Sequence, residues 1–158
     1  MTIDFRPAAI PADRKLLADM DALCFPVDAP PHFEGAHWFI GWASARSDGT
    51  REPASPAAYC AWKPVDHDGV AMGFHYRAGV MPDYRGHALQ RRMIRLREDE
   101  MRAAGLRTAV TYTDADAAAS MRNLIAEGYR PYAPTPATTL SGLGRLGRVG
   151  FVHWRKSL

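Results

Sequence analysis

The chain has 158 residues, of which 47% are hydrophobic and 23% charged, and this balance is that of a folded domain with its own apolar core. A formal net charge of +3 favours anionic ligands but is far from that of a dedicated nucleic-acid-binding protein. No apolar run approaches the ~20 residues that span a bilayer, and Met1 to Arg6 lack the layout of a signal peptide. We therefore expect one soluble, cytoplasmic domain over residues 1–158.

The first half of the chain predicts four strands and one helix. Short apolar or alternating runs mark the strands, and an apolar stripe at helical spacing, followed by prolines, marks the helix. An Asp-Gly pair indicates a hairpin turn before the fourth strand. The expected elements are a strand around Ile3 and Phe5, a helix over 16–24, strands over 38–43, 57–62 and 70–81, a loop over 47–56 and a turn over 66–69.

The second half alternates helices with strands. A glycine stands after each of its two helical patterns, which is typical of a helix end. The expected elements are a helix over 86–104, a strand over 107–113, a helix over 117–125, strands over 129–132 and 149–154, and a long loop over 134–147. The order β-α-β-β-β-α-β-α-β-β predicts an α/β fold with a mixed central sheet and helices on both faces.

The two cysteines and a small histidine cluster do not predict a metal site. Cys24 and Cys60 are too few for a disulfide framework and lack metal-ligand spacing, so we expect buried free thiols. His32, Glu34 and His37 lie close in sequence, but not at the His-Glu-x-x-His spacing of zinc proteases. We expect no metal.

The stretch 80–94 carries the clearest chemical signal. A strand ends before Pro82, a tight turn follows, and a basic helix begins at Gly86. The first turn of a helix presents unpaired N–H groups and the positive end of the macrodipole, and a preceding glycine lets an anion approach. Because Arg85 and Arg91 add positive charge, the pattern favours a pyrophosphate site. The alternative is an ordinary strand-to-helix turn with a solvated basic helix.

The same stretch resembles the coenzyme A signature of the Gcn5-related N-acetyltransferase (GNAT) family. In that family a strand ending in Val-x-Pro precedes Arg-Gly-x-Gly-x-Gly or Ala, which opens a long helix. This chain has Val80-Met81-Pro82 and then Arg85-Gly86-His87, and it departs from the signature at Ala88 and Gln90.

A second stretch is similar to the later helix of the family, which ends in Gly-Phe or Gly-Tyr. Here Ser120 to Asn123 is followed by Gly128-Tyr129. Ala117 stands where many members have Asn, and Leu124 stands where some have a Tyr that protonates the leaving thiolate.

The resemblance covers nearly the whole chain and implies a GNAT-like acyl-CoA N-acyltransferase fold. It implies acetyl-CoA as co-substrate and transfer of its acetyl group to a primary amine by direct attack in a ternary complex. Strand backbone would pair with the pantetheine arm, and a backbone N–H near Val80 would polarise the thioester carbonyl. The cofactor-binding residues implied are Gly79, Val80, Met81, Arg85, Gly86, His87, Ala88, Leu89, Gln90, Arg91, Ser120 and Asn123.

The amine must be neutral to attack, which calls for a general base or a water chain. The candidates are His75 and Tyr76, on opposite faces of the fourth strand, and Glu34 or Asp28 in the connector that the resemblance places on the acceptor side. Each has an ordinary alternative, namely a structural histidine, a core tyrosine or a solvated loop carboxylate. Tyr112 and Tyr132 are candidates for the acid.

Two further functions compete with the acetyltransferase. One is a non-catalytic acyl-CoA-binding module or sensor with the same fold. The other is a nucleic-acid-binding module, which is supported only by the mild positive net charge. We read Arg91, Arg92, Arg95 and Arg97 as an exposed helix face beside cofactor phosphates, and the aromatics of 38–42 as core or pocket wall.

A literal G-x-G-x-x-G at 142–147 lacks the following helix that dinucleotide binding needs, so we read it as a hairpin loop. The expected partners are a small-molecule amine or a peptide acceptor. We expect no nucleic acid and no membrane, and a homodimer fits the resemblance.

Overall fold

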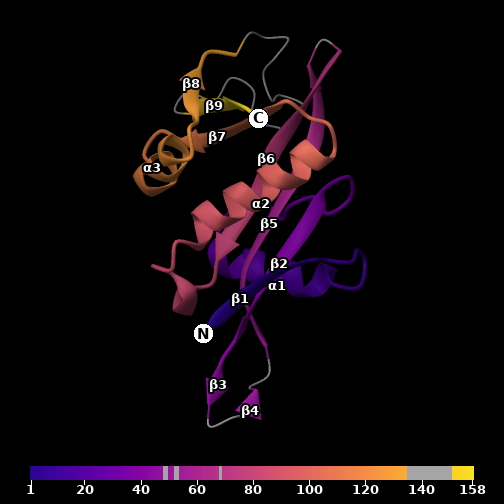
Figure 1. The fold of residues 1–158 in the computed structure, drawn as a ribbon, viewed down its shortest axis with the longest axis vertical. Helices are drawn as coiled ribbons and strands as arrows, with labels where there is room; N and C mark the ends of the chain where they lie inside the picture. The colour runs from indigo at the N-terminus through magenta and orange to yellow at the C-terminus, as the bar shows by residue number, and fades with distance from the viewer. Residues whose placement is uncertain (48–49, 52–53, 68, 135–150) are drawn as a thin grey trace. The chain divides into compact units, whose positions relative to one another are not determined.

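The computed structural model describes residues 1–47, 50–51, 54–67, 69–134 and 151–158 (Figure 1). Its long elements follow the predicted order, and two short strands are added. In chain order they are β1 (Thr2–Pro7), α1 (Arg14–Cys24), β2 (His37–Ser44), β3 (Arg46–Ser47), β4 (Thr50–Arg51), β5 (Ser55–His67), β6 (Val70–Val80), the 3-10 helix η1 (Pro82–Tyr84), α2 (Leu89–Ala103), β7 (Thr108–Asp114), α3 (Ala118–Ala126), β8 (Arg130–Tyr132) and β9 (Phe151–Ser157).

Seven strands form one mixed sheet in the order β1-β2-β5-β6-β7-β9-β8, and β3 pairs with β4 in a separate ribbon. β6 and β7 run parallel, whereas β1–β2, β2–β5, β7–β9 and β8–β9 are antiparallel. Parallel neighbours need a crossover connection, and α2 supplies it here. The predicted α/β class with a mixed sheet is confirmed.

The element boundaries differ from the prediction at four places. The expected loop over 47–56 contains β4, and β5 already begins at Ser55. β5 also continues to His67, five residues beyond the expected strand and into the expected 66–69 turn. α2 begins at Leu89 rather than at Gly86, because Gly86 (φ +85°) and Ala88 (φ +54°) adopt left-handed backbone conformations that a right-handed helix excludes. β9 continues to Ser157, while most of the expected 134–147 loop and the start of the expected last strand lie outside the described residues.

Contacts divide the chain into two compact units, residues 1–63 with 76–93 and residues 64–75 with 94–158. β5, β6 and α2 each contribute residues to both units. The single domain over 1–158 stays a prediction.

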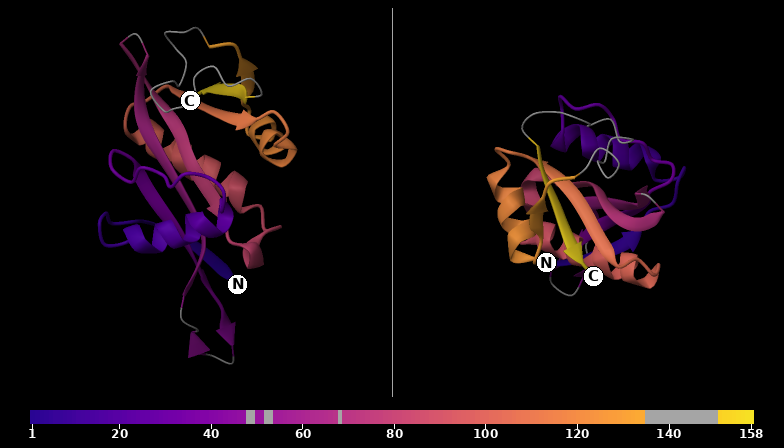
Figure 2. Two further views of the ribbon diagram at one scale, coloured as in Figure 1. Left: turned by 180° about the vertical axis from the view of Figure 1, so that it is seen from behind. Right: turned by 90° about the horizontal axis from the view of Figure 1, so that it is seen from above.

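The core of the first unit lies between α1 and the strands. Within this unit, α1 covers one face of β2 and β5, and α2 begins on the other face (Figures 1 and 2). Leu17 and Met20 lie on the buried stripe of α1, as its apolar spacing predicts. The buried cluster consists of Leu17, Met20, Phe33, Trp38, Ile40, Tyr59, Ala61 and Met81.

A buried ion pair joins α1 to the sheet in the first unit. Asp21 is 3% exposed, and Arg77 on β6 donates to both of its carboxylate oxygens, from Nε at 2.7 Å and from Nη2 at 2.8 Å. The hydroxyl of Tyr59 on β5 donates to the same carboxylate at 2.6 Å. These three donors replace the water that the carboxylate loses on burial.

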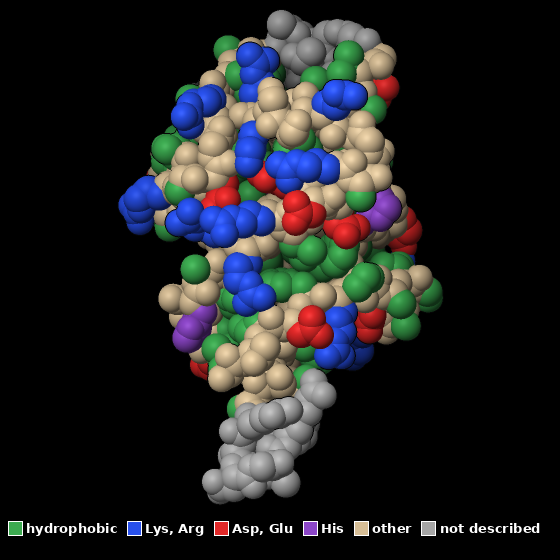
Figure 3. Space-filling model, viewed as in Figure 1, with side chains coloured by type: hydrophobic (Ala, Val, Ile, Leu, Met, Phe, Trp, Pro, Cys, Tyr) green, Lys and Arg blue, Asp and Glu red, His purple; other side chains and the backbone are tan. Residues whose placement is uncertain are grey.

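The second unit packs α2 on one face of its strands. A Cβ at Gly73 on β6 would overlap the side chain of Met101 on α2, so glycine is needed for this close approach. Lys156 on β9 donates to both oxygens of the buried Glu98 on α2, at 2.9 and 3.0 Å. The outward surface of α2 and α3 carries basic and acidic side chains together (Figure 3). One of the expected exposed arginines, Arg97, is instead 4% exposed, which corrects the prediction.

We predict that Asp21→Leu lowers the free energy of unfolding by about 3–5 kcal/mol, because it removes both short bonds of the half-buried Arg77 guanidinium and leaves it only the more distant Asp28, at 3.8 Å. Urea unfolding monitored by circular dichroism measures this change. The matched control is Asp19→Leu, whose exposed pair with Lys15 contributes about 0–1 kcal/mol. Equal losses for the two variants would contradict the role assigned to the buried pair.

Candidate cofactor and acetyl-transfer site

The end of β6 presents a strand edge that no neighbouring strand occupies in the described register. β6 pairs with β7 only at Gly73 and Phe74, whereas its far end is held from the β5 side by the bond from the Met81 N–H to the Ala57 carbonyl, at 2.9 Å. Backbone N–H directions alternate along a strand. The N–H of Val80 therefore points away from β5, at the opposite edge of β6.

Gly79 brings the backbone of β6 close to Tyr59. A Cβ at Gly79 would lie 2.5 Å from the Tyr59 ring and 2.7 Å from its hydroxyl oxygen. Because Tyr59 is fully buried and bonded to Asp21, its ring has little room to move. Glycine at this position therefore lets β6 pass directly over the tyrosine.

A tight turn connects β6 to α2. η1 places Pro82 at the start of the turn, and the chain reverses through two left-handed residues, Gly86 and Ala88. The Arg92 N–H donates to the Ala88 carbonyl at 3.3 Å, which marks the start of the helical hydrogen bonds. Within the part of the chain that the structure describes, the N–H groups of Gly86, His87 and Ala88 show no protein acceptor.

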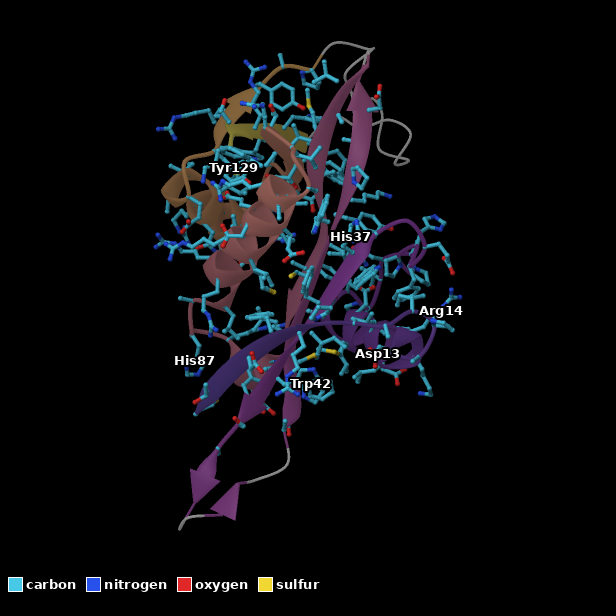
Figure 4. The ribbon with its side chains drawn as sticks, turned by 45° about the vertical axis from the view of Figure 1, so that its right-hand side comes forward. Asp13, Arg14, His37, Trp42, His87 and Tyr129 are labelled. Atoms are coloured by element: carbon cyan, nitrogen blue, oxygen red, sulfur yellow. The ribbon has the colours of Figure 1, made fainter. Side chains whose placement is uncertain are left out.

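The charged side chains of this turn are Asp83, in η1, and Arg85, which lies nearer to the start of α2. Arg85 is exposed and its Nε donates to the Val80 carbonyl at 3.4 Å, which holds it beside the end of β6. The first turn of α2 contains no acidic residue, so nothing there offsets the positive end of the helix dipole. His87, also exposed, lies on the same turn (Figure 4). N–H groups, helix dipole and arginine are the features that bind phosphate oxygens.

The thiol of Cys24 lies next to this strand end. Its Sγ donates to the Val80 carbonyl at 3.6 Å. Burial raises the pKa of the thiol, although the nearby Arg85 opposes the shift. A thiol that stays protonated is a poor nucleophile, so this cysteine does not suit a covalent acyl-enzyme route. Neither cysteine is in a disulfide bond; Cys60 is buried, as predicted, whereas Cys24 is only half-buried, which corrects the prediction for that thiol.

The acceptor-side candidates in the first unit differ in their surroundings. The Tyr76 hydroxyl oxygen accepts the His32 N–H at 2.7 Å, and its ring meets the edge of Trp38 and the ammonium of Lys63. Glu34 keeps 68% of its side chain exposed and pairs with Arg14 at the start of α1.

Asp28 lies 3.8 Å from the Arg77 guanidinium, so it extends the buried ion-pair network rather than pointing alone into solvent.

His75 belongs to the second unit and is 5% exposed. Its Nε2 lies 2.5 Å from the hydroxyl of Tyr129, which Figure 4 labels. Among the described residues its Nδ1 has no hydrogen-bond partner. Burial, with a smaller effect of Arg97 and Lys156, lowers the pKa of the imidazole well below its usual value. These surroundings are those of a neutral structural histidine rather than of a base that meets a substrate.

Leu89, Gln90 and Arg91 begin α2 in the first unit, where Leu89 is buried. The other predicted residues lie in the second unit. Ser120 and Asn123 are half-buried on α3, and Leu124 is buried there. Tyr112 stacks on Phe74. Tyr132 meets the edge of the His153 ring.

Sequence reasoning missed Asp21, Tyr59 and Arg77. The apolar stripe of α1 gave no reason to expect that Asp21 is buried. The one available signal was Arg77, a basic residue within a largely apolar strand, which needs a partner when the strand is buried.

Among the described residues no group of three or more His, Cys, Asp or Glu side chains is arranged to hold a metal ion. No described helix is long and apolar enough to cross a membrane.

The fold matches solved structures of N-acetyltransferases over its full length. The NatC complex bound to Gag peptide and CoA aligns with a TM-score of 0.72 at 16% identity, covering 100% of this chain and 99% of that one. Arabidopsis thaliana Naa50 in complex with the bisubstrate analogue CoA-Ac-MVNAL gives 0.72 at 10% identity, with complete coverage of both chains. The ribosomal-protein-S18-alanine N-acetyltransferase from Escherichia coli gives 0.68 at 15%, covering 99% and 94%.

The chain therefore has the GNAT acyl-CoA N-acyltransferase fold, as the sequence motifs predicted. No family model matches the sequence, and no curated protein does so either. The likeness is one of structure at low identity.

We predict that Gly79→Ala lowers the free energy of unfolding by about 1–3 kcal/mol, because the added methyl group overlaps the Tyr59 ring. A double-mutant cycle with Tyr59→Leu, followed by urea unfolding, tests the cause. The double variant should be more stable than the sum of the two single effects predicts, since the smaller side chain leaves room for the methyl group. Strict additivity would show that the contact is not the source of the loss.

We predict that the protein loses stability as the pH falls below about 6.5 because of His75. The unfolded chain protonates this histidine near pH 6.5, whereas the folded protein does so only at lower pH, so unfolding takes up a proton between the two values. The loss attributable to it is at most about 1.4 kcal/mol per pH unit. Unfolding free energies at about pH 7.5, 6.5 and 5.5 measure the slope.

His75→Gln should reduce this slope, and the exposed His87→Gln should leave it unchanged. Burial also lowers the pKa of His153, so a part of the slope persists in either variant. A slope that is identical in wild type and His75→Gln would contradict the assignment.

Proposed function

We propose that this protein is an acetyl-CoA-dependent N-acetyltransferase that acts on a primary amine. The observation that carries the proposal is the continuous run from the open edge of β6 at Val80 to the turn at Gly86 and the start of α2. A strand edge suits the amide groups of pantetheine, and the turn suits the pyrophosphate. Both features lie in the first unit.

In the proposed complex, the backbone of Gly79 to Met81 pairs with the pantetheine arm, and the Val80 N–H polarises the thioester carbonyl and stabilises the tetrahedral oxyanion. The N–H groups of Gly86, His87 and Ala88 receive the phosphates, with the side chain of Arg85 as a counter-charge. Ala88 replaces a usual glycine but still adopts a left-handed φ of +54°, so the turn keeps the conformation for which glycine is preferred. Ser120 and Asn123 stay proposed cofactor contacts.

The acceptor amine attacks the acetyl carbon directly, and the C–N bond forms as the tetrahedral oxyanion develops. Collapse of this intermediate breaks the C–S bond, the nitrogen loses a proton, and the coenzyme A thiolate takes one up to leave as the thiol. Positioning of the two substrates supplies much of the rate. We favour Tyr76 and Glu34 over His75 as groups that handle the amine proton, because His75 is buried and bonded to Tyr129. A hydroxyl that accepts a backbone N–H, as Tyr76 does, is held in place to exchange a proton.

The acceptor is a small-molecule amine, an amino acid or a peptide N-terminus. Peptides come first in the test panel because two of the structurally similar enzymes were solved with a peptide or a peptide-containing analogue. The alternative function is acyl-CoA binding without transfer, which the buried Leu124 favours, since some GNAT members have a tyrosine acid at this place.

We predict that Gly86→Asp weakens acetyl-CoA binding at least about tenfold, or about 1.4 kcal/mol, because it puts a negative side chain on a left-handed residue of the phosphate turn. Isothermal titration calorimetry with acetyl-CoA measures the affinity. The matched control is Gly69→Asp, which makes the same change at a hairpin residue with φ +79° and open space around it. Unchanged affinity in Gly86→Asp would refute the cofactor site.

Release of free coenzyme A thiol across the amine panel separates the two functions. Release with one amine class identifies an acetyltransferase and its acceptor. Binding without release for any amine favours the acyl-CoA-binding module.

A further inference from the structure

The sheet of the second unit has a face turned away from α2. Gly73 faces Met101 of α2, and successive side chains of a strand point to opposite faces. Met72 and Phe74 therefore lie on the face that α2 does not cover. The register continues this face across the neighbouring strands, because Phe74 pairs with Val110 on β7.

Two arginines stand directly opposite each other on this face. Val110 pairs with Arg155 on β9, and Arg155 pairs with Arg130 on β8, so their side chains share one row across the sheet. Like charges at directly opposed positions destabilise a strand pair. Both side chains are exposed, so solvent screens part of this repulsion, and an anion bound between them would offset the rest.

No carboxylate of the described residues forms an ion pair with either arginine. Arg130 donates to the Tyr129 carbonyl at 3.0 Å, and the Arg155 guanidinium lies 5.2 Å from the centre of the Tyr132 ring. Lys156, by contrast, is already neutralised by Glu98.

The C-terminal part of the sequence also has more basic than acidic residues. Residues 128–158 contain five basic side chains, namely Arg130, Arg145, Arg148, Arg155 and Lys156, and no Asp or Glu. The rest of the chain has 15 basic and 17 acidic residues, from the totals of 20 and 17. The segment that joins β8 to β9 therefore supplies no carboxylate for the two arginines.

A pocket of about 890 Å³ opens at the same place. Its lining combines Arg130 and Arg155 with Met72, Val110 and Tyr132. The volume is that of a small-molecule site, roughly 300–1,000 Å³, and such sites join apolar walls to a few polar groups that orient the ligand.

We propose that this pocket binds a small organic anion. Its carboxylate or phosphate group is held by Arg130 and Arg155, and its apolar part lies against Met72 and Tyr132. A guanidinium presents parallel N–H donors that match both kinds of oxyanion. All these residues belong to the second unit, so the site uses none of the residues of the first unit to which we assign the coenzyme A phosphates.

Phenyl phosphate and benzoate are the two probes, and benzyl alcohol is the uncharged control. Each is titrated into the full chain carrying Gly86→Asp, which removes the proposed phosphate turn from the measurement. Amide chemical-shift changes locate the probe, and calorimetry gives its affinity. We expect an anionic probe to shift Met72, Val110 and Tyr132, and benzyl alcohol to bind at least about tenfold more weakly. Tighter binding of phenyl phosphate indicates a phosphate ester as the natural ligand, and tighter binding of benzoate a carboxylate.

Arg155→Gln and Arg130→Gln should each weaken the anionic probe at least about tenfold. The matched control is Arg122→Gln, an exposed arginine of α3 outside the pocket, which should change the affinity less than about twofold. Both pocket variants should melt at or above the wild-type temperature, because each removes one of two opposed like charges.

The proposal is overturned if neither anion binds, if shifts fall only outside the pocket, or if Arg122→Gln weakens binding as much as Arg155→Gln does. Acetyl-CoA affinity is measured separately, so a failure here leaves the proposed acetyltransferase site standing, and the reverse also holds.

Discussion

The buried carboxylate of Asp21 is the group around which the first unit is organised. A charge removed from water needs partners in fixed positions, and here α1 supplies the carboxylate while β5 and β6 supply Tyr59 and Arg77. Arg77 also lies 4.3 Å from the centre of the Phe25 ring and approaches Asp28, so the connector after α1 is held by the same network. Arg77 stands two residues before Gly79, and Tyr59 sets how closely Gly79 approaches. The network thereby fixes the strand end that the proposed cofactor would meet.

The proposed acetyl transfer makes modest chemical demands on side chains. Most of the assigned contacts are backbone groups of β6 and of the turn before α2, whose directions follow from strand geometry and from the left-handed residues Gly86 and Ala88. Such preorganised dipoles stabilise developing charge without reorganising during the reaction. The departures from the family signature at Ala88 and Gln90 are therefore compatible with the proposed role, since the role belongs to backbone N–H groups. The raised pKa of the half-buried Cys24 thiol fits direct attack by the amine rather than an acyl-cysteine route.

The two faces of the sheet in the second unit differ in whether their charged side chains have partners of opposite charge. Toward α2, the buried Glu98 is neutralised by Lys156 and Arg102, and the His75 imidazole contacts the Tyr129 hydroxyl. On the other face, Arg130 and Arg155 stand opposed with no carboxylate partner among the described residues, beside the aromatic rings of Tyr132 and His153. The repulsion between these two aligned guanidinium groups beside the pocket is therefore not offset by the protein's own described carboxylates. An external anion would offset it.

The sequence by itself determined the order of the long elements, the mixed sheet and the turn at Gly86, because apolar periodicity, prolines and glycines act over a few neighbouring residues. It also carried the resemblance from which the fold and the proposed cofactor followed. Only the tertiary structure decided which polar residues meet, because Asp21 with Arg77, His75 with Tyr129, and Arg130 with Arg155 are joined by sheet register and helix packing across 25 to 56 positions of the chain. It also decided that α2 starts at Leu89, since the left-handed Ala88 depends on how the turn closes. Local patterns predict elements, whereas long-range packing determines the partners and hence the chemistry.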